Sequence, residues 1–510
     1  MNQHSRMVRS VVIVGGGTAG WMAASALARA FAEPGSDQPM QITVVESETI
    51  GTVGVGEATI PPIRKFIETI GLDESDFMAA TGATIKLGIA FQNWSAPNSR
   101  YFHGFGDHGP AVRGQPYRQH LFRLKNEGRI ETLEPWSVPG VMARQGRFAP
   151  PVQDPRSILS AYSYAFHFDA GLFAQRLRSL AEAAGVVRIE GRIVDVEAGD
   201  GRVDAIRLDD GRRLDADLFI DCSGFRGLLI EGALKAGYED WTRWLPCDRA
   251  IALPCAAAAP PVPFTTATAM TAGWRWRIPL QHRVGNGYVY SSAFIDDQTA
   301  LEELLQGVEA PPAAEPNRLR FVTGRRRSAW MGNVVSLGLA SGFLEPLEST
   351  SINLIQTGIG RLLELFPDRD FDPVLIAEYN RRTAQEFERI RDFIIAHYHL
   401  AGRTEGELWR HCRETPPPDT LAAKLDLFRA RGEVALLEDE SFREDSWAAV
   451  LTGLGVWPKR VSPLVERLEL SRVEAQAGRL AELIGKAVAS LPDHRDYLTA
   501  RSAASMEPAA

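Results

Sequence analysis

The chain has few cysteines and no long apolar run. Its four cysteines, Cys222, Cys247, Cys255 and Cys412, lie far apart and form no CxxC or CxxH motif, which predicts free thiols in a reducing compartment and no metal site. The apolar run at residues 11–14 is too short for the core of an export signal and ends in glycines. No apolar stretch reaches the roughly 18 residues that a membrane helix needs. These absences predict a soluble, cytoplasmic protein with no membrane partner.

An excess of one charge sign is also missing. The 56 basic and 64 acidic residues give a net charge of -8, which argues against a nucleic-acid or anionic-membrane partner. The composition, 45% hydrophobic and 24% charged, is that of an ordinary globular protein. A length of 510 residues allows a large core and indicates two or three domains.

A glycine-rich turn near the N-terminus predicts a dinucleotide site. An apolar strand at residues 11–14, an Ala-rich helix at residues 21–31 and a second strand at residues 41–45 form one βαβ unit. Glu46 follows the second strand and suits an unphosphorylated ribose, so FAD or NAD is favoured over NADP. The glycines allow a tight bend, close approach of a pyrophosphate and close helix–strand packing. The candidate binding residues of this turn are Gly15, Gly17, Thr18, Ala19 and Gly20.

The fold class expected is α/β, with a mixed sheet and a mainly helical C-terminal region. Residues 1–400 are predicted to form one discontinuous module, and residues 401–510 a helical region that completes a substrate pocket. Residues 98–151 are rich in Gly, Pro, His and Arg and are expected to be long loops over a cleft, with disorder as the alternative. Residues 187–220 suggest a small sheet, and residues 250–330 a substrate-side sheet.

Three further segments contain candidate functional residues. Lys86 lies among Ile85, Leu87 and Ile89, which would draw it into the interior, where an ammonium must be paired or lose its proton; the alternative is a surface lysine. Trp274, Trp276 and Ile278 alternate along an expected strand, which core packing alone would also explain. A third segment, residues 343–350, contains Glu348, whose alternative role is to bind backbone amides at a helix start.

Together, the glycine turn, the Lys86 segment, the WxWxIP sequence at residues 274–279 and the FLEPLEST sequence at residues 343–350 resemble the flavin-dependent halogenases of the tryptophan halogenase family, from about residue 10 to residue 400. The resemblance implies a Rossmann-like FAD module of the aromatic-hydroxylase type. Residues 217–224 and 332–340 are similar to its second and third flavin segments. The cofactor residues that the resemblance implies elsewhere are Val55, Glu57 and Ala58 in a strap over the flavin, together with Leu339 and Ile352.

The resemblance also implies a reaction. In the family, reduced flavin, O2 and chloride or bromide give hypohalous acid, which travels to a lysine matched here by Lys86. That lysine either hydrogen-bonds the acid or forms a haloamine, and the sequence leaves both open. Glu348 would stabilise the cationic ring and accept its proton, and Ser349 would link flavin and substrate sites. Thr350 and Ser351 match the halide site, although the best-studied members have glycine in place of Ser351, which leaves the halide preference open.

The resemblance implies partners too. Self-reducing aromatic hydroxylases have an Asp-Gly dipeptide where this chain has residues 222–226, and no second GxGxxG follows a strand. FADH2 is therefore expected from a separate NAD(P)H-dependent reductase, and a homodimer is one state that the sequence allows. Trp274 and Trp276 would keep the organic substrate from the flavin.

An indole-type substrate is expected. His103 and Phe105 match a His-x-Phe that the family uses against indole, the phenyl ring stacking on its face; a hydrogen-bonded loop histidine is the alternative. Beyond residue 400 the chain has Tyr497 and no adjacent tyrosine pair, which speaks against free tryptophan. Two other functions stay open, a flavin-dependent aromatic hydroxylase or epoxidase and a non-catalytic FAD-binding protein.

Overall fold

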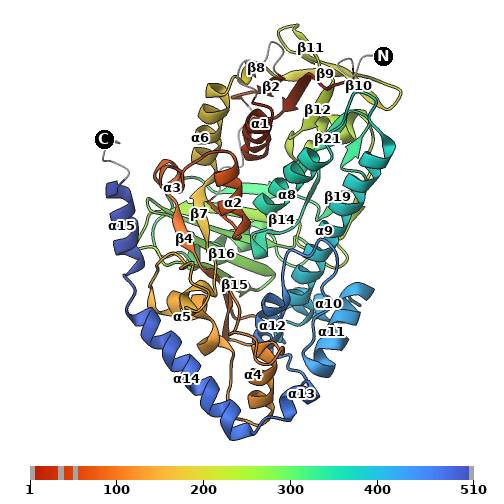
Figure 1. Cartoon of the computed structure of the whole chain (residues 1–510). Helices are drawn as coiled ribbons and strands as arrows, with labels where there is room; N and C mark the ends of the chain where they lie inside the picture. The colour runs from red at the N-terminus through yellow and green to blue at the C-terminus, as the bar shows by residue number, and fades with distance from the viewer. Residues whose placement is uncertain (1–5, 33–39, 50–55, 505–510) are drawn as a thin grey trace.

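A six-stranded, mostly parallel sheet forms the upper part of the molecule in Figure 1. The computed structural model describes residues 6–32, 40–49 and 56–504. Neighbours from β21 to β8 pair in parallel, and β20 is an antiparallel edge strand. The strands, in spatial order, are β20 (Trp330–Met331), β21 (Val334–Ser336), β12 (Leu218–Asp221), β1 (Ser10–Val14), β2 (Gln41–Glu46) and β8 (Val187–Glu190).

The apolar run of β1 is buried on both faces because two layers cover the sheet. Val11 and Ile13 belong to one core with the helices α1 (Thr18–Ala30) and α6 (Ala170–Ala183). Val12 and Val14 belong to another, with a small antiparallel sheet. That small sheet consists of β9 (Ile193–Gly199), β10 (Arg202–Leu208) and β11 (Arg213–Asp215). The alternation along β1 therefore separates two cores across a single strand.

The prediction of one small sheet over residues 187–220 is wrong in its grouping. β8 and β12 belong to the six-stranded sheet, and only β9 to β11 form the separate one. The reason is that parallel neighbours are joined by long crossovers, so sequence proximity identifies hairpins and not parallel partners.

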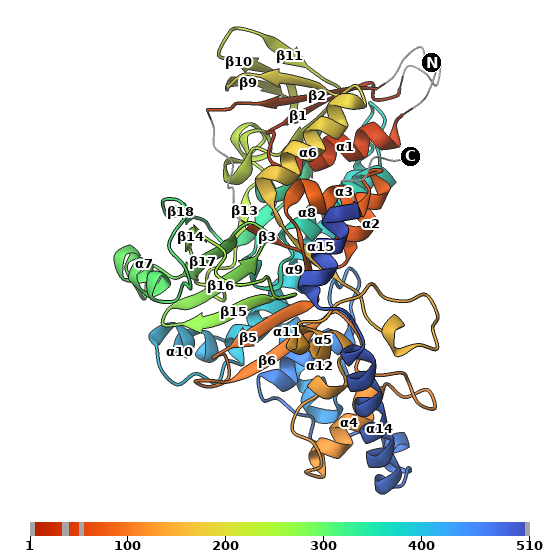
Figure 2. The same ribbon diagram turned by 90° about the vertical axis from the view of Figure 1, so that its left-hand side faces the viewer.

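A seven-stranded mixed sheet forms the middle of the molecule (Figure 2). β15 pairs in parallel with β5, and the other neighbours are antiparallel. Residues 250–330 therefore share their sheet with two strands from residues 88–104. The strands, in spatial order, are β18 (Asn317–Arg320), β14 (Arg249–Cys255), β17 (Val284–Tyr290), β16 (Gly273–Pro279), β15 (Thr265–Met270), β5 (Gly88–Gln92) and β6 (Arg100–Gly104).

Two three-stranded sheets lie against these larger ones. The first has the order β3 (Gly56–Ala58), β7 (Ala165–Asp169) and β4 (Thr84–Lys86), and the second β13 (Tyr238–Asp240), β19 (Gly324–Arg326) and β22 (Gly342–Phe343). The short helices α2 (Pro62–Thr69) and α3 (Glu74–Thr81) precede β4, and α7 (Asp297–Gln306) follows β17.

Residues 98–151 are not the long loops that their composition suggested. They contain β6, α4 (Tyr117–Asn126) and α5 (Val138–Gln145). Much of the glycine and proline there marks helix ends, because Pro139 lies in the first turn of α5 and Gly146 ends it at φ 64°. Ser137 caps the same helix by accepting from the Gly140 amide.

Helices make up the C-terminal region, as expected. The long α9 (Pro373–His399) leads into α10 (Glu407–Glu414), α11 (Asp419–Arg431), α12 (Glu444–Gly453), α13 (Pro463–Glu466), α14 (Leu470–Ala489) and α15 (His494–Ala504). In Figure 1, α14 runs along the lower edge beside α4 and α5, and α15 turns back towards α3. None of the helices in the described ranges combines the length and apolar character that a bilayer crossing requires.

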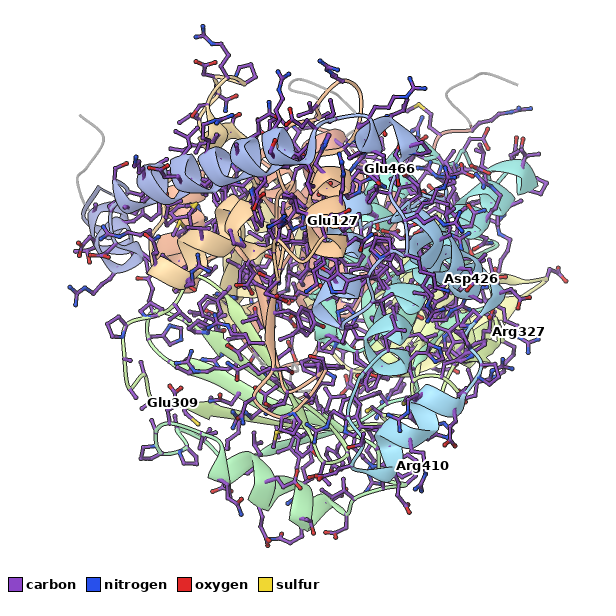
Figure 3. All side chains as sticks on the ribbon, turned by 90° about the horizontal axis from the view of Figure 1, so that it is seen from below. Glu127, Glu309, Arg327, Arg410, Asp426 and Glu466 are labelled. Atoms are coloured by element: carbon purple, nitrogen blue, oxygen red, sulfur yellow. The ribbon has the colours of Figure 1, made fainter. Side chains whose placement is uncertain are left out.

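Charged side chains of both signs surround the lower face. In Figure 3, which looks at the molecule from below, Glu127 follows α4, Asp426 projects from α11, and Arg410 from α10. The residues labelled in this view include both acidic and basic side chains.

Candidate active site

The carboxyl ends of β1, β2, β12 and β21 meet at one edge of the parallel sheet, where open α/β sheets bind ligands. Gly15 follows β1 at φ 105°, and a Cβ there would lie 2.4 Å from the Cys222 carbonyl oxygen. A Cβ on Gly20 would lie 1.9 Å from the Gly15 carbonyl oxygen. Glycine is therefore required at both positions by backbone contacts within the fold itself.

At position 17, by contrast, packing within the fold does not require glycine. Gly17 precedes α1 with φ -76°, and a Cβ there would meet none of the described residues within 4 Å. None of the described side chains caps this helix start, so the first amides of the helix, at Thr18 and Ala19, have no side-chain cap in the part of the chain that the structure describes. Uncapped amides at a positive dipole end, with free space above them, fit a pyrophosphate.

Glu46 and a second turn complete this edge. The Glu46 carboxylate lies directly over Gly16, close enough to meet a Cβ placed there, and contacts Arg188 and the Trp21 indole. The 3-10 turn η6 (Gly338–Ala340) approaches from β21, with Gly338 at φ 62° against Ala19. Half-buried Leu339 lies in this turn, and buried Ile352 follows nearby in α8 (Ser351–Glu364). These residues fit an FAD dinucleotide.

The strap is described only in part. Val55 lies outside the described residues, while Glu57 and Ala58 lie in β3, paired with β7. Glu57 is partly exposed, yet it is deep enough among protein atoms for desolvation to raise its pKa to about 7.

Lys86 is fully buried at the end of β4. Its Nζ donates to the Thr59 carbonyl oxygen at 2.9 Å and to Ser349 Oγ at 2.7 Å, and it lies 5.2 Å from the centroid of the Phe105 ring. Burial lowers the pKa of Lys86 to about 7, although nearby Glu348 acts in the opposite direction. Near neutral pH, both protonation states of the lysine are therefore available. The ammonium form has one N–H left beyond the two that donate to Thr59 and Ser349.

Glu348 ends the 3-10 turn η7 (Pro346–Glu348) and is fully buried between two histidines. Oε2 lies 2.9 Å from His103 Nδ1. Oε1 lies 2.9 Å from His397 Nε2, within ion-pair distance but not aligned as a hydrogen bond. Burial alone would raise the pKa of Glu348, but His103 and His397 lower it to about 2. The carboxylate is therefore ionised throughout the neutral range.

The chain leaves Glu348 through a strained residue and an uncapped helix start. Ser349 has φ 60°, a left-handed conformation uncommon for serine, and it accepts the bond from Lys86. Thr350 precedes α8 without a side-chain cap, and its buried Oγ1 has no hydrogen-bond partner among the described residues. The amides at Ser351 and beyond can therefore receive a small anion.

Aromatic rings surround His103. The ring centroids of Phe105, Phe393 and Phe442 lie 6.3, 5.7 and 5.9 Å from its own, and Phe393 stacks on Phe442 at 4.0 Å. His103 Nε2 is buried without a hydrogen-bond partner within the described ranges. Lys86, which lies 5.2 Å from the Phe105 ring, and Glu348, which is bonded to His103, lie beside this aromatic cluster.

Trp274 and Trp276 lie on one face of β16, with centroids 6.1 Å apart. Trp274 Nε1 donates to Glu345 Oε2 at 2.8 Å, and the Tyr398 hydroxyl donates to the same oxygen at 2.6 Å. Burial raises the pKa of Glu345 to about 7. A buried carboxylate thus fixes the orientation of the first tryptophan.

The fold brings together Lys86, Glu348, Ser349, His103 and Phe105, which come from three separate segments, while the glycine turn lies at the sheet edge. The sequence did not identify His397, Glu345 or Phe393. His397 and Phe393 lie in the long helix α9, whose apolar spacing predicts burial without showing which strand it faces. Glu345 stands three residues before Glu348 and gave no separate signal.

The buried ammonium has a measurable consequence for stability. Lys86 has a pKa of about 7 in the folded protein and an ordinary value of 10.5 when unfolded, so between these values the unfolded chain binds more protons. Stability at this position therefore rises with pH across that window. Relative to Lys86→Met, the wild type should gain about 1 kcal/mol per pH unit between pH 7 and pH 10. Thermal midpoints of both proteins across this range measure the effect; a constant difference would contradict it.

Known proteins are similar to this chain over most of its length. The family model described as tryptophan halogenase matches residues 10–469. Tryptophan 7-halogenase RebH from Lentzea aerocolonigenes is 35% identical, with 97% of this chain and 99% of that protein aligned.

Solved structures agree over nearly the whole length. BrvH, a flavin-dependent halogenase from Brevundimonas sp. BAL3, is 48% identical with a TM-score of 0.93 over 97% of this chain and 99% of its own. Xcc4156, a flavin-dependent halogenase from Xanthomonas campestris, is 44% identical with a TM-score of 0.92 and the same coverage. The chain therefore belongs to the tryptophan halogenase family and is a flavin-dependent halogenase.

Proposed function

We propose that this enzyme is a two-component halogenase, which takes FADH2 from a separate reductase and halogenates an electron-rich, indole-type aromatic with chloride or bromide and O2. The observation that supports it most is that buried Lys86 lies within the electrostatic influence of ionised Glu348, beside the aromatic side chains around His103. When bound, reduced FAD reacts with O2, and this reaction supplies the oxidising power that converts halide to hypohalous acid.

Lys86 directs the halogen. With a pKa of about 7, the ammonium can donate its remaining N–H to hypohalous acid, which polarises the halogen towards the ring. The neutral amine can instead attack the halogen: an N–halogen bond forms, the O–halogen bond breaks, and the departing hydroxide takes the proton of the amine as water. Both routes place electrophilic halogen at Nζ, and the bonds to Thr59 and Ser349 fix that position.

Glu348 stabilises the ring cation that the halogen creates. A carboxylate with a pKa of about 2 is a weak base, so its main contribution is negative charge at a buried position next to the ring. It also accepts the ring proton, and His103 and His397 on either side can share that proton. The open amides from Thr350 to Ser351 supply the halide site.

The pocket favours an indole without a charged amino-acid end. Relatives are named for tryptophan, but Tyr497, the tyrosine beyond residue 400, packs on Phe148 and bonds to Arg501. Buried Glu440 is held by Lys424 and the Trp447 indole. Neither Tyr497 nor Glu440 is free to bind an ammonium or carboxylate of the substrate.

Gly17 provides a test of the cofactor site. Because a Cβ at this position meets no atom of residues 6–32, 40–49 or 56–504 within 4 Å, Gly17→Ala should leave the thermal midpoint of the apoprotein unchanged. The methyl group should nonetheless block the pyrophosphate and weaken FAD binding by about tenfold or more. The control is Gly478→Ala in α14, where a Cβ also meets open space. Titration of both variants with FAD measures the effect, and equal affinities would remove Gly17 from the site.

The reaction itself is tested by incubating the enzyme with FAD, a flavin reductase, NADH, halide and indole, followed by mass spectrometry. Replacement of one hydrogen by one halogen supports the proposal. Addition of one oxygen would indicate a hydroxylase or epoxidase, and an unchanged substrate across a panel of aromatics would indicate an FAD-binding protein without this activity.

A further inference from the structure

We propose that His494, at the start of the C-terminal helix α15, is a positioning residue that holds the strand of Lys86 in place. The two come from opposite ends of the chain, yet the His494 ring lies against the backbone of β4. The inference rests on the role of Lys86 proposed above.

Among the described strands, β4 is an edge strand with a partner on one side only. On one side it pairs with β7, through Ile85 opposite Phe166 and Lys86 opposite Ala165. On the other side the Ile85 amide donates to His494 Nε2 at 3.3 Å, and the Leu87 amide donates to the Pro263 carbonyl oxygen at 2.8 Å. Ile85 is fully buried, so water could not replace the histidine, and its loss would leave a buried N–H unpaired.

The histidine is oriented for this task. Its Nδ1 lies 2.8 Å from the Pro261 carbonyl oxygen, which can only accept, so Nδ1 holds the proton and Nε2 is the acceptor. Burial lowers the pKa of His494 to about 4, and the ring is therefore neutral at neutral pH. His494 thus joins the segment at Pro261 to β4 through one ring.

The segment around His494 is itself firmly anchored. The His494 amide donates to the Gly146 carbonyl oxygen at 2.8 Å, and the Phe148 amide donates to the Pro492 carbonyl oxygen at 3.1 Å. The Phe148 ring packs edge-on against Tyr497 at 4.7 Å. In Figures 1 and 2, α15 lies beside α3, which precedes β4 in the chain. The histidine is therefore part of a rigid support.

The consequence concerns where the halogen goes. Lys86 Nζ reaches Thr59 and Ser349 only if its own backbone stays in register. A displacement of about 1 Å can cost about 10²-fold in a positioned reaction. Loosening β4 should therefore leave halide oxidation intact while hypohalous acid escapes Lys86 and enters solution.

Three substitutions at His494 distinguish its bond to Ile85 from its bond to Pro261. Glutamine places its amide near the position of Nε2, so His494→Gln can still accept from Ile85. Asparagine reaches only the position of Nδ1, so His494→Asn keeps the bond to Pro261 and loses the one to Ile85. His494→Ala loses both. The quantity measured is halogenated product per FADH2 oxidised, together with hypohalous acid trapped by an added scavenger.

We expect His494→Ala and His494→Asn to lower the product yield per FADH2 about tenfold, with a matching rise in trapped hypohalous acid, and His494→Gln to stay within about threefold of wild type. Arg501→Ala is the control, because Arg501 anchors α15 to Ser75 without touching β4; its yield should be unchanged.

Equal yields in the Asn and Gln variants would overturn the proposal, and this comparison suffices if the Ala variant does not fold. A lower thermal midpoint with an unchanged yield would make His494 purely structural. Failure of the role proposed for Lys86 can be told apart from failure of the role proposed for His494, because in the first case Lys86→Ala would also retain its product yield.

Discussion

Lys86→Ala is expected to lower halogenated product by at least about 10³-fold while FAD still binds and halide is still oxidised. The reason is position: Lys86 lies beside the Phe105 ring, bonded to Thr59 and Ser349, and not at the glycine turn that fits the dinucleotide. Hypohalous acid should therefore be released instead of product. Product formation and scavenger-trapped oxidant, measured on one preparation, give the result.

The control for this variant is Lys65→Ala. The Lys65 side chain is 76% exposed and forms an ion pair with Glu68 of its own helix, so its loss should leave turnover unchanged. Product formation by Lys86→Ala at a tenth of the wild-type rate or more would exclude the role proposed for the lysine.

Glu348→Gln should lower kcat by about 10²-fold or more with little change in KM. Glutamine keeps the shape of the side chain but removes the buried charge that the ring cation needs, and its amide cannot take the ring proton. Because His103 and His397 lose their anionic partner, the thermal midpoint should also fall. Steady-state kinetics per folded molecule separate the two effects.

Glu345→Gln is the matched control, since Glu345 is equally buried three residues earlier. Its carboxylate accepts from Trp274 and Tyr398, bonds that a glutamine oxygen can also accept, so kcat should change little. If Glu348→Gln lost stability but kept its turnover, Glu348 would be a structural acid and Lys86 would act without it.

The sequence predicted the local parts of the fold well. The apolar run before Gly15 and the strand ending at Glu46 appear as β1 and β2, and the alternation of Trp274 with Trp276 appears as β16. Each depends on a period or a turn readable within about ten residues. The helical C-terminal region followed in the same way from its spacing.

The features that could not be predicted from the sequence depend on contacts between residues that lie far apart in the chain. The pairing of β15 with β5 in parallel joins residues 265–268 to residues 89–92, and no local pattern specifies it. The same holds for His397 against Glu348 and for His494 against Ile85, which meet only because α9 and α15 pack where they do. The prediction for residues 98–151 was wrong for another reason. Glycine and proline are common in loops, but several of those in this segment begin or end helices.

The central claim is that halogen is delivered from Lys86 and not by hypohalous acid free in solution. The ratio of halogenated isomers from one indole-type substrate tests it most directly, when compared with the ratio given by free hypohalous acid in the same buffer. If Lys86 and the aromatic rings around His103 fix one ring carbon beside the halogen, a single isomer should predominate with the enzyme. An isomer mixture equal to that of the free acid would contradict the account.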